Sequence, residues 1–204
     1  MHEQEILTNY DEFVLSEAFP TSIRSTALLA GQEIKQILAD GQWSERFAVN
    51  VGKGQVLIPA RLRFAEEVLA IPKTESAWLV ARALQTRSFD GFERQRAVND
   101  LIPAIEEWTA PFIVALIGEY VVEILQDIEA KLSPRGELVL ATFVADNAAF
   151  WATTKQRVAS YWNVYYRKYG SFNSERGFSR SEYVGFDLIK RLEKAATSMR
   201  NTAV

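Results

Sequence analysis

Cysteine is absent from the 204-residue chain, and histidine occurs once, at His2. Without cysteine the chain cannot form disulfides, thiolate nucleophiles or thiolate metal sites. A single histidine beside the N-terminus allows neither a Ser-His-Asp arrangement nor a histidine-based metal site, so we expect no bound metal. Phosphate-binding glycine loops of the GxGxxG and GxxxxGK[ST] types are also missing. These absences predict a protein without a cofactor and without a catalytic centre.

Long apolar runs are missing as well. The most apolar stretch, residues 110–125, is interrupted by Glu119 and Glu123 and falls short of the roughly 20 apolar residues that span a bilayer. The N-terminal residues include two early acids and no basic segment followed by an apolar run, which is not typical of a secretory signal. We therefore expect a cytoplasmic protein that does not bind membranes.

What the sequence does contain is typical of a globular protein. Hydrophobic residues make up 48% of the chain and charged residues 24%, which suffices for one domain over residues 1–204. Charge is unevenly distributed: residues 1–149 carry 13 Lys and Arg against 22 Asp and Glu, whereas residues 150–204 carry 10 against 4. An acidic body with a basic, aromatic end can steer a charged partner or associate with a second copy of itself.

The periodicity of apolar residues predicts a mainly α-helical fold with one small N-terminal β-hairpin. Residues 43–64 alternate apolar and polar side chains on both sides of the Gly52-Lys53-Gly54 turn, and Pro59 assigns its strand to an edge or a bulge. Helical spacing predicts helices over residues 3–19, 23–38, 76–87, 92–102, 111–132, 137–144, 147–169 and 183–199. We expect an irregular or HEAT-like helical bundle whose main core is formed by residues 76–132 and 147–169.

The first candidate functional segment covers residues 87–98 and contains Arg87, Asp90, Arg94 and Arg96. It resembles the inter-helix turn and second helix of a HEAT-type repeat, in which an acid in the turn and an arginine in the next helix commonly join neighbouring units. A structural role explains the same residues, because Asp90 can cap the helix and Arg94 can reach back to it. We favour the structural role.

The second candidate is a stripe of acids in residues 118–127. On one continuous helix, Glu119 and Glu123 share a narrow face with Asp127, while apolar residues cover most of the circumference. Two acids four residues apart repel each other, so this stripe should recruit Arg94, Arg96 or Arg157. The alternative is a general acid/base pair or a metal site, that is, an enzyme with a polar site of Glu and Arg.

The third candidate is the aromatic and basic segment 157–169. Trp162, Tyr165 and Tyr169 fall on the same helical face as Trp151 and Val158, which predicts that these rings belong to the core. The remaining side chains form a candidate interaction surface of Tyr161, Tyr166, Arg167 and Lys168. Aromatic rings among basic residues also suit single-stranded nucleic acid, although an overall pI of about 5.4 argues against it.

Four segments together resemble a set of uncharacterised bacterial helical proteins, some of them encoded beside toxins. These segments are Ile58-Pro59 in the hairpin and residues 87–98, 118–125 and 160–167, and the resemblance spans residues 45–170. It implies a bacterial, cytosolic helical protein and no activity. Our main hypothesis is a non-enzymatic protein that binds a protein partner, most concretely an immunity or antitoxin protein that neutralises its partner. The alternatives are a helical scaffold that binds nucleic acid through the basic C-terminal third, and the enzyme above; a homo-oligomer is compatible with each.

Overall fold

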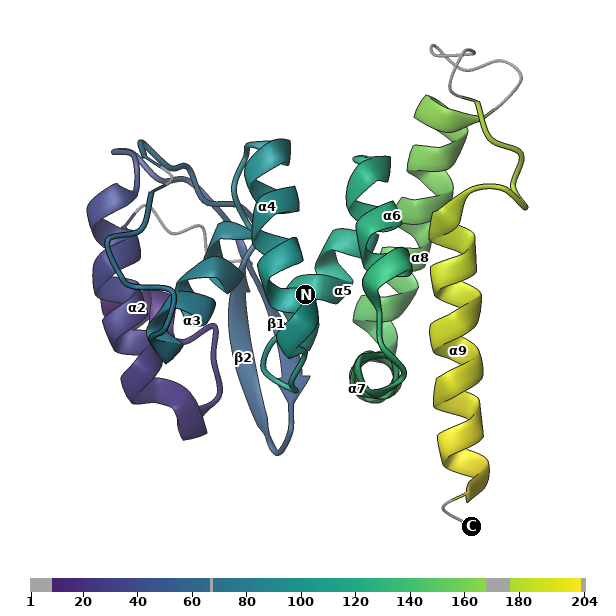
Figure 1. Ribbon diagram of the computed structural model, residues 1–204, viewed down its shortest axis with the longest axis horizontal. Coiled ribbons are helices and arrows are strands. Elements are labelled where there is room, and N and C mark those ends of the chain that lie inside the picture. Colours follow the sequence, from purple (N-terminus) through teal and green to yellow (C-terminus); the bar gives the residue numbers. More distant parts are fainter. Residues whose placement is uncertain (1–8, 67, 168–176, 203–204) are drawn as a thin grey trace. The chain divides into compact units, whose positions relative to one another are not determined.

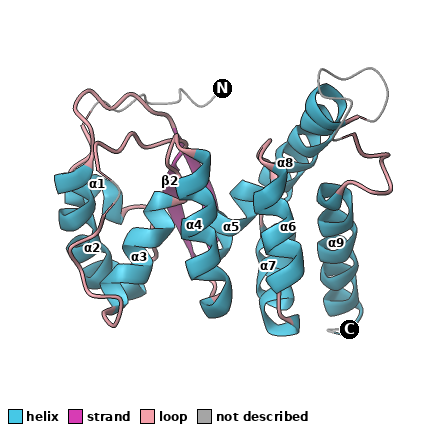
Figure 2. Ribbon diagram, turned by 45° about the horizontal axis from the view of Figure 1, so that its top comes forward, coloured by secondary structure: helices cyan, strands magenta, loops and turns pink. Residues whose placement is uncertain are grey.

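The computed structural model describes residues 9–66, 68–167 and 177–202, and within them the fold is mainly helical with one two-stranded sheet (Figures 1 and 2). This confirms the predicted fold class. The α-helices are α1 (Glu12–Ser16), α2 (Arg24–Ile37), α3 (Ser76–Gln85), α4 (Gly91–Leu101), α5 (Ala110–Ile117), α6 (Val122–Lys131), α7 (Pro134–Asp146), α8 (Ala148–Tyr161) and α9 (Val184–Thr202). Two short 3₁₀ turns cover Thr21–Ile23 and Ile102–Ala104.

The chain divides into two compact units, Met1–Phe112 and Ile113–Val204, and α5 runs across the boundary. In the first unit α2 packs against both α1 and α3, and α3 packs against α4. The approach of α1 to α2 is close: a Cβ on Gly31 would lie 3.0 Å from the Glu12 backbone, so glycine allows the two helices to pack this tightly. Whether the chain behaves as a single domain stays a prediction.

The hairpin lies in the first unit and pairs β1 (Arg46–Val51) with β2 (Gly54–Pro59) in antiparallel register. Val49 lies opposite Val56, and both are buried together with Ile58, because alternate side chains of a strand point to the same face. Gly52 turns the chain with a φ of 58°, a left-handed conformation that glycine adopts without strain. Pro59 is the last residue of β2, and in this two-stranded sheet β2 is an edge strand, as the missing N–H of Pro59 predicts.

In the second unit α9 packs along α7 and also contacts α6 and α8. The core of this unit contains Leu125, Ile128, Leu140, Val158 and Leu192, all fully buried. The N-terminus of α7 follows a standard capping pattern, because the Ser133 side chain accepts a hydrogen bond from the Gly136 N–H and Pro134 occupies the first turn.

Several predicted helices are wrong in their extent; for example, α7 begins three residues before the predicted residue 137. The first helix covers neither residues 9–11 nor residues 17–19, since α1 runs only from Glu12 to Ser16 with Asp11 as its cap, and residues 1–8 lie outside the described residues. The helix predicted for 111–132 is interrupted between Ile117 and Val122. At the interruption the Tyr166 hydroxyl donates to the Tyr120 carbonyl (2.6 Å) and accepts from the Val122 N–H (3.3 Å). A side chain from 44 residues downstream thus satisfies backbone groups that a continuous helix would pair internally.

The predicted aromatic core face of residues 147–169 is also partly wrong. After α8 the chain forms a π-helical turn over Trp162–Tyr166, in which each turn contains more residues than an α-helix. The wider turn leaves Tyr165 exposed (44%), while Trp162 and Tyr166 are half-buried. Trp162 donates from Nε1 to the Phe178 carbonyl (3.1 Å). Tyr169 lies outside the described residues.

Candidate functional site

The turn between α3 and α4 is built by residues from the first candidate segment. Asp90 caps α4, because its carboxylate accepts hydrogen bonds from the backbone N–H groups of Phe92 (2.7 Å) and Glu93 (3.4 Å). Four orphan N–H groups begin every helix, and an aspartate at this position satisfies two of them. The cap fixes where α4 begins and therefore which of its residues face α3.

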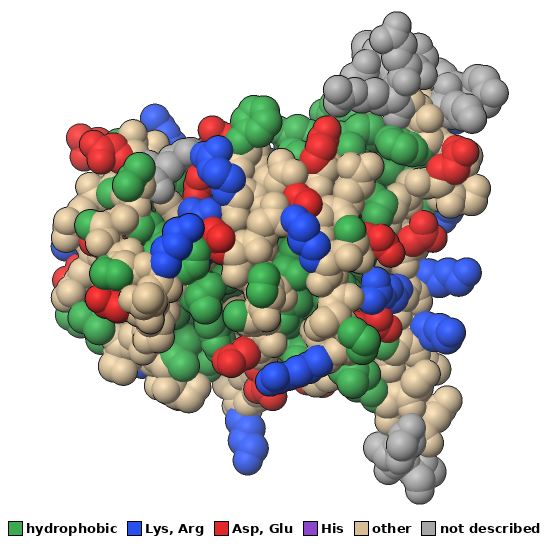
Figure 3. Space-filling view, viewed as in Figure 1, with side chains coloured by type: hydrophobic (Ala, Val, Ile, Leu, Met, Phe, Trp, Pro, Cys, Tyr) green, Lys and Arg blue, Asp and Glu red, His purple; other side chains and the backbone are tan. Residues whose placement is uncertain are grey.

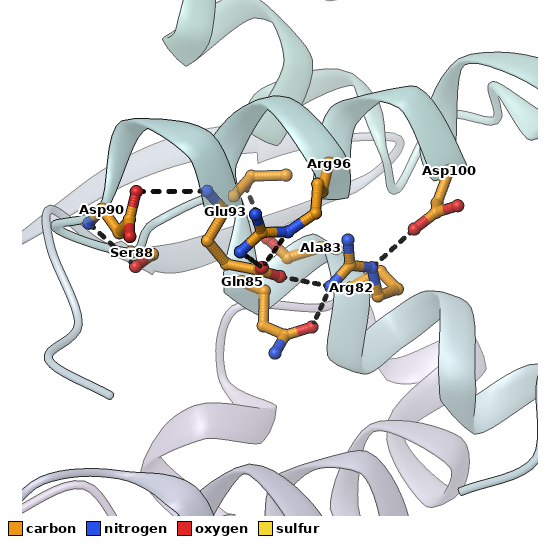
Figure 4. A network of polar contacts seen from close by, with 9 residues as sticks. Arg82, Ala83, Gln85, Ser88, Asp90, Glu93, Arg96 and Asp100 are labelled. Carbon is orange, nitrogen blue, oxygen red and sulfur yellow. Dashed lines mark hydrogen bonds and ion pairs between the residues drawn. The ribbon is translucent and has the colours of Figure 1, made fainter. Parts of the chain in front are cut away.

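Facing α3, the carboxylate of Glu93 lies between two arginines (Figure 4). Arg82 on α3 donates from Nη1 to Glu93, and Arg96 donates to it from Nε (2.9 Å) and Nη2 (2.7 Å). The side chains of Arg82 and Glu93 are only 8% and 2% exposed. Such a buried pair is tolerated because each charge has its counter-charge and hydrogen bonds nearby.

Arg82 extends the cluster in two further directions. Its Nε donates to Asp100 on α4 (2.7 Å), and its Nη1 donates to the Gln85 side chain (2.5 Å). Two carboxylates and two guanidinium groups thus alternate along the contact between α3 and α4. We call these four residues, Arg82, Glu93, Arg96 and Asp100, the charge cluster.

The charge cluster lines a groove of about 710 Å³ in the first unit. Its other wall comes from the segment that precedes α3, which is held to α2 because the Ala70 N–H donates to the Glu33 carboxylate. Trp78 stands at the groove with cations on its ring: the Lys73 ammonium is 5.1 Å and the Arg82 guanidinium carbon 5.8 Å from the ring centroid. The remaining lining residues are Val68, Leu69, Ile71 and Asn99.

The other arginines of the predicted network hold backbone together. Arg94 is 1% exposed and donates from Nη1 to the carbonyls of Ser88 and Phe89, both at 2.9 Å. Arg87 is 3% exposed and donates to the carbonyls of Pro59 (3.2 Å) and Ala60 (2.7 Å) at the end of β2. These contacts join the α3–α4 turn to itself and to the hairpin; the sequence predicted a structural role for Arg94 through Asp90, whereas its hydrogen bonds here go to the carbonyls of Ser88 and Phe89.

The acidic stripe is divided by the interruption after α5. Glu119 is buried and precedes α6, whereas Glu123 is half-buried in the first turn of α6, so the two do not share one helix face. Arg157 is exposed on α8. Among the described residues no group of three or more His, Asp or Glu side chains is arranged to hold a metal ion.

A second hollow, of about 220 Å³, lies beside the hairpin and is flanked by two exposed aromatic rings. Trp43 is 69% exposed and Phe89 is 56% exposed, and Arg61 lies in the same lining. Between them, Ser44 is buried and its Oγ accepts the Arg61 N–H (2.9 Å), while the Tyr10 hydroxyl donates to the Ser44 carbonyl (3.2 Å). We call this feature the Trp43–Phe89 pocket; hydrogen bonds fix Ser44 in its lining, which also contains Glu45 and Ala60.

Of the predicted interaction surface in the second unit, the structure describes Tyr161, Tyr166 and Arg167. Tyr161 forms a ring cluster with Tyr120 and Tyr165, at centroid distances of 5.9–6.1 Å. Tyr166 anchors the α5–α6 connection through its hydroxyl, as described above. Arg167 is exposed and donates to Asn163 (3.2 Å), and Lys168 lies outside the described residues.

Several cations of the basic C-terminal third are engaged with acids. Arg191 on α9 donates to Glu137 (2.5 Å), and Lys155 on α8 pairs with Glu193 (2.6 Å). On the face shown in Figure 3, basic and acidic side chains are interspersed with apolar ones. The net positive charge of residues 150–204 suggested a surface that binds the phosphates of nucleic acid. Because several of these cations are paired with acids, that suggestion has less support.

Sequence reasoning did not single out Arg82, Glu93, Asp100 or Trp78. A signal for Arg82 exists: it is a charged residue within the otherwise apolar run Ala77-Trp78-Leu79-Val80-Ala81-Arg82-Ala83-Leu84. A charge in such a run is buried only with a partner, which points to an acid on the next helix. Trp43 and Phe89 carry no comparable signal, because an exposed aromatic residue looks like a core residue in the sequence.

Comparison with known proteins gives no relative: no family model matches the chain, and neither a curated protein nor a solved structure matches it significantly. Among the described helices, none combines the length and apolar character that crossing a membrane requires.

Proposed function

We propose that this chain is a non-enzymatic protein that binds a protein partner through the Trp43–Phe89 pocket. The observation that carries the proposal is the exposure of two large aromatic rings, 69% and 56%, in the lining of one hollow. Tryptophan and arginine are the residue types most enriched at the energetic centres of protein interfaces, and Trp43 and Arg61 lie together here. An immunity or antitoxin protein, which acts by covering a partner, is the most concrete form of this function.

The buried charges fit the same function. Glu93 is enclosed by two arginines, and Arg94 and Arg87 are used to hold backbone carbonyls. Groups engaged in this way stabilise the body that presents the pocket. A small partner-binding protein needs such a rigid body, because a surface that is already ordered loses less entropy on association.

Site-specific photocrosslinking in the native cell tests the proposal. p-Benzoylphenylalanine replaces Trp43 in one variant and Leu29 in the control; Leu29 is 59% exposed on α2 and does not line the pocket. We expect a discrete crosslinked protein from position 43 only. The purified partner should bind the unmodified chain, and Phe89→Ala should weaken binding by about tenfold or more, as expected for a residue at the centre of an interface.

Two results would count against this function. One is an identical crosslinking pattern at positions 43 and 29, which would mean that the pocket makes only random encounters. The other is a partner whose affinity is unchanged by Phe89→Ala. Circular dichroism of each variant verifies that the fold is retained.

A further inference from the structure

We propose a second binding site in the first unit: the groove beside the charge cluster binds an acidic, apolar peptide segment, with an Asp or Glu side chain on Lys73 and an apolar side chain against Trp78. The lining residues of this groove and those of the Trp43–Phe89 pocket do not overlap. The site therefore adds to the proposed function and does not depend on it.

The charges of the groove leave a positive excess. Glu93 and Asp100 are the acids of the lining, and Lys73, Arg82 and Arg96 are its cations. Both acids are engaged by arginines of the charge cluster, through Arg82–Asp100 (2.7 Å), Arg82–Glu93 and Arg96–Glu93 (2.7 Å). Lys73 makes no ion pair with an acid in the described part of the chain, and its printed contact is with the Trp78 ring. A ligand that neutralises the excess positive charge of this groove is anionic.

The position of Lys73 suits an incoming carboxylate. Its ammonium lies 5.1 Å from the Trp78 centroid and the residue is exposed, so it remains hydrated and can accept a partner without leaving the ring. The surrounding unit carries more acids than bases, 16 against 11 in residues 1–112. Within this acidic unit Lys73, which has no acid partner among the described residues, is a local positive charge that favours acidic ligands.

The opposite wall of the groove supplies apolar contact. Val68 is 79% exposed, and Leu69 and Ile71 are half-buried beside it. Trp78 is half-buried and lines the same groove, so part of its ring is accessible to an apolar side chain of the ligand. A hollow of about 710 Å³ falls within the range of specific ligand sites, about 300–1,000 Å³, and has room for several side chains.

An unbiased peptide selection tests this site. Random 12-residue peptides displayed on phage are selected on the full chain, and the most enriched peptides are synthesised and titrated by fluorescence polarisation. The titrations use the wild type, Lys73→Glu and the control Lys53→Glu. Lys53 is an exposed lysine in the hairpin turn of the same unit, so the control carries the same charge change away from the groove.

We expect the enriched peptides to combine Asp or Glu with Leu, Phe or Trp. Lys73→Glu should weaken their binding by about tenfold or more, whereas Lys53→Glu should bind as the wild type does. Raising the salt concentration should weaken binding as well, because the contact at Lys73 is exposed. Failure to enrich any peptide overturns the proposal, and so do enriched peptides without acids or equal binding by Lys73→Glu. None of these results affects the crosslinking at Trp43.

Discussion

Arg82 and Glu93 form an ion pair that joins α3 to α4 with both side chains almost completely withdrawn from solvent. Glu93 also forms an ion pair with Arg96, and Arg82 forms one with Asp100, so each charge of the pair has more than one partner. A buried pair of this kind contributes little net stability compared with apolar residues of the same size, but removing one partner leaves a buried charge uncompensated. The pair therefore fixes the register of α3 on α4 and makes this contact sensitive to mutation.

Glu93→Gln should be strongly destabilising. The amide cannot neutralise Arg82, and we expect the free energy of unfolding to fall by about 3–5 kcal/mol, the usual cost of breaking a buried ion pair. Chemical denaturation measures the change. Glu107→Gln, at an exposed position, is the control and should stay within about 0.5 kcal/mol of the wild type. Similar stabilities for the two variants would contradict the burial of the pair.

Tyr183→Phe should stabilise the protein. The Tyr183 side chain is fully buried, and its hydroxyl has no hydrogen-bond partner among the described residues. Removing a buried polar group without a partner should raise the free energy of unfolding by about 1 kcal/mol. Tyr166→Phe is the matched comparison: its hydroxyl bonds Tyr120 and Val122, so its loss should cost about 1–2 kcal/mol. Thermal melts showing the opposite signs would refute both assignments.

Stability should decline in alkaline solution, and Tyr183 should contribute to the decline. Burial, with a smaller effect of Tyr166, raises the pKa of the Tyr183 phenol above its ordinary value of about 10. The folded state thus keeps this proton while the unfolded state loses it. The contribution of Tyr183 is fully present below pH about 10 and is lost as the pH rises toward the pKa of the folded state.

Urea denaturation at pH 8 to 11 measures this effect. Tyr183→Phe should lose less stability than the wild type above pH about 10. Burial also raises the pKa of Tyr10, so part of the alkaline decline should remain in the variant. Parallel curves for the two proteins would show that Tyr183 titrates normally in the folded state.

Trp162→Ala and Tyr165→Ala should differ, because the π-helical turn separates their environments. Trp162 bonds the Phe178 carbonyl and meets Phe186 edge to face at 5.6 Å, so its truncation should cost about 2–4 kcal/mol. Tyr165 is 44% exposed and its truncation should cost about 1 kcal/mol or less. The midpoints of chemical denaturation measure the stability of both variants. Equal losses of stability would support an uninterrupted α-helix with both rings in the core.

Local sequence determined the parts of this fold that depend on neighbouring residues. The alternation around Gly52 specified the hairpin, Asp90 specified the start of α4, and apolar spacing specified α2 and α3. The structural role favoured for residues 87–98 rested on Asp90 as a capping residue, and the structure shows this cap at the start of α4.

Only the tertiary structure determined which groups the buried charges pair with and which aromatic rings remain exposed to solvent. Tyr166 holds the interruption between α5 and α6 from 44 residues away, and no local propensity at Gly118 specifies that contact. Glu93 on α4 pairs with Arg82 on α3, whereas Trp43 and Phe89 line one pocket while staying exposed. Helical periodicity reports the face on which a residue lies; the elements that cover that face, and hence burial and charge pairing, are set by contacts between segments distant in sequence.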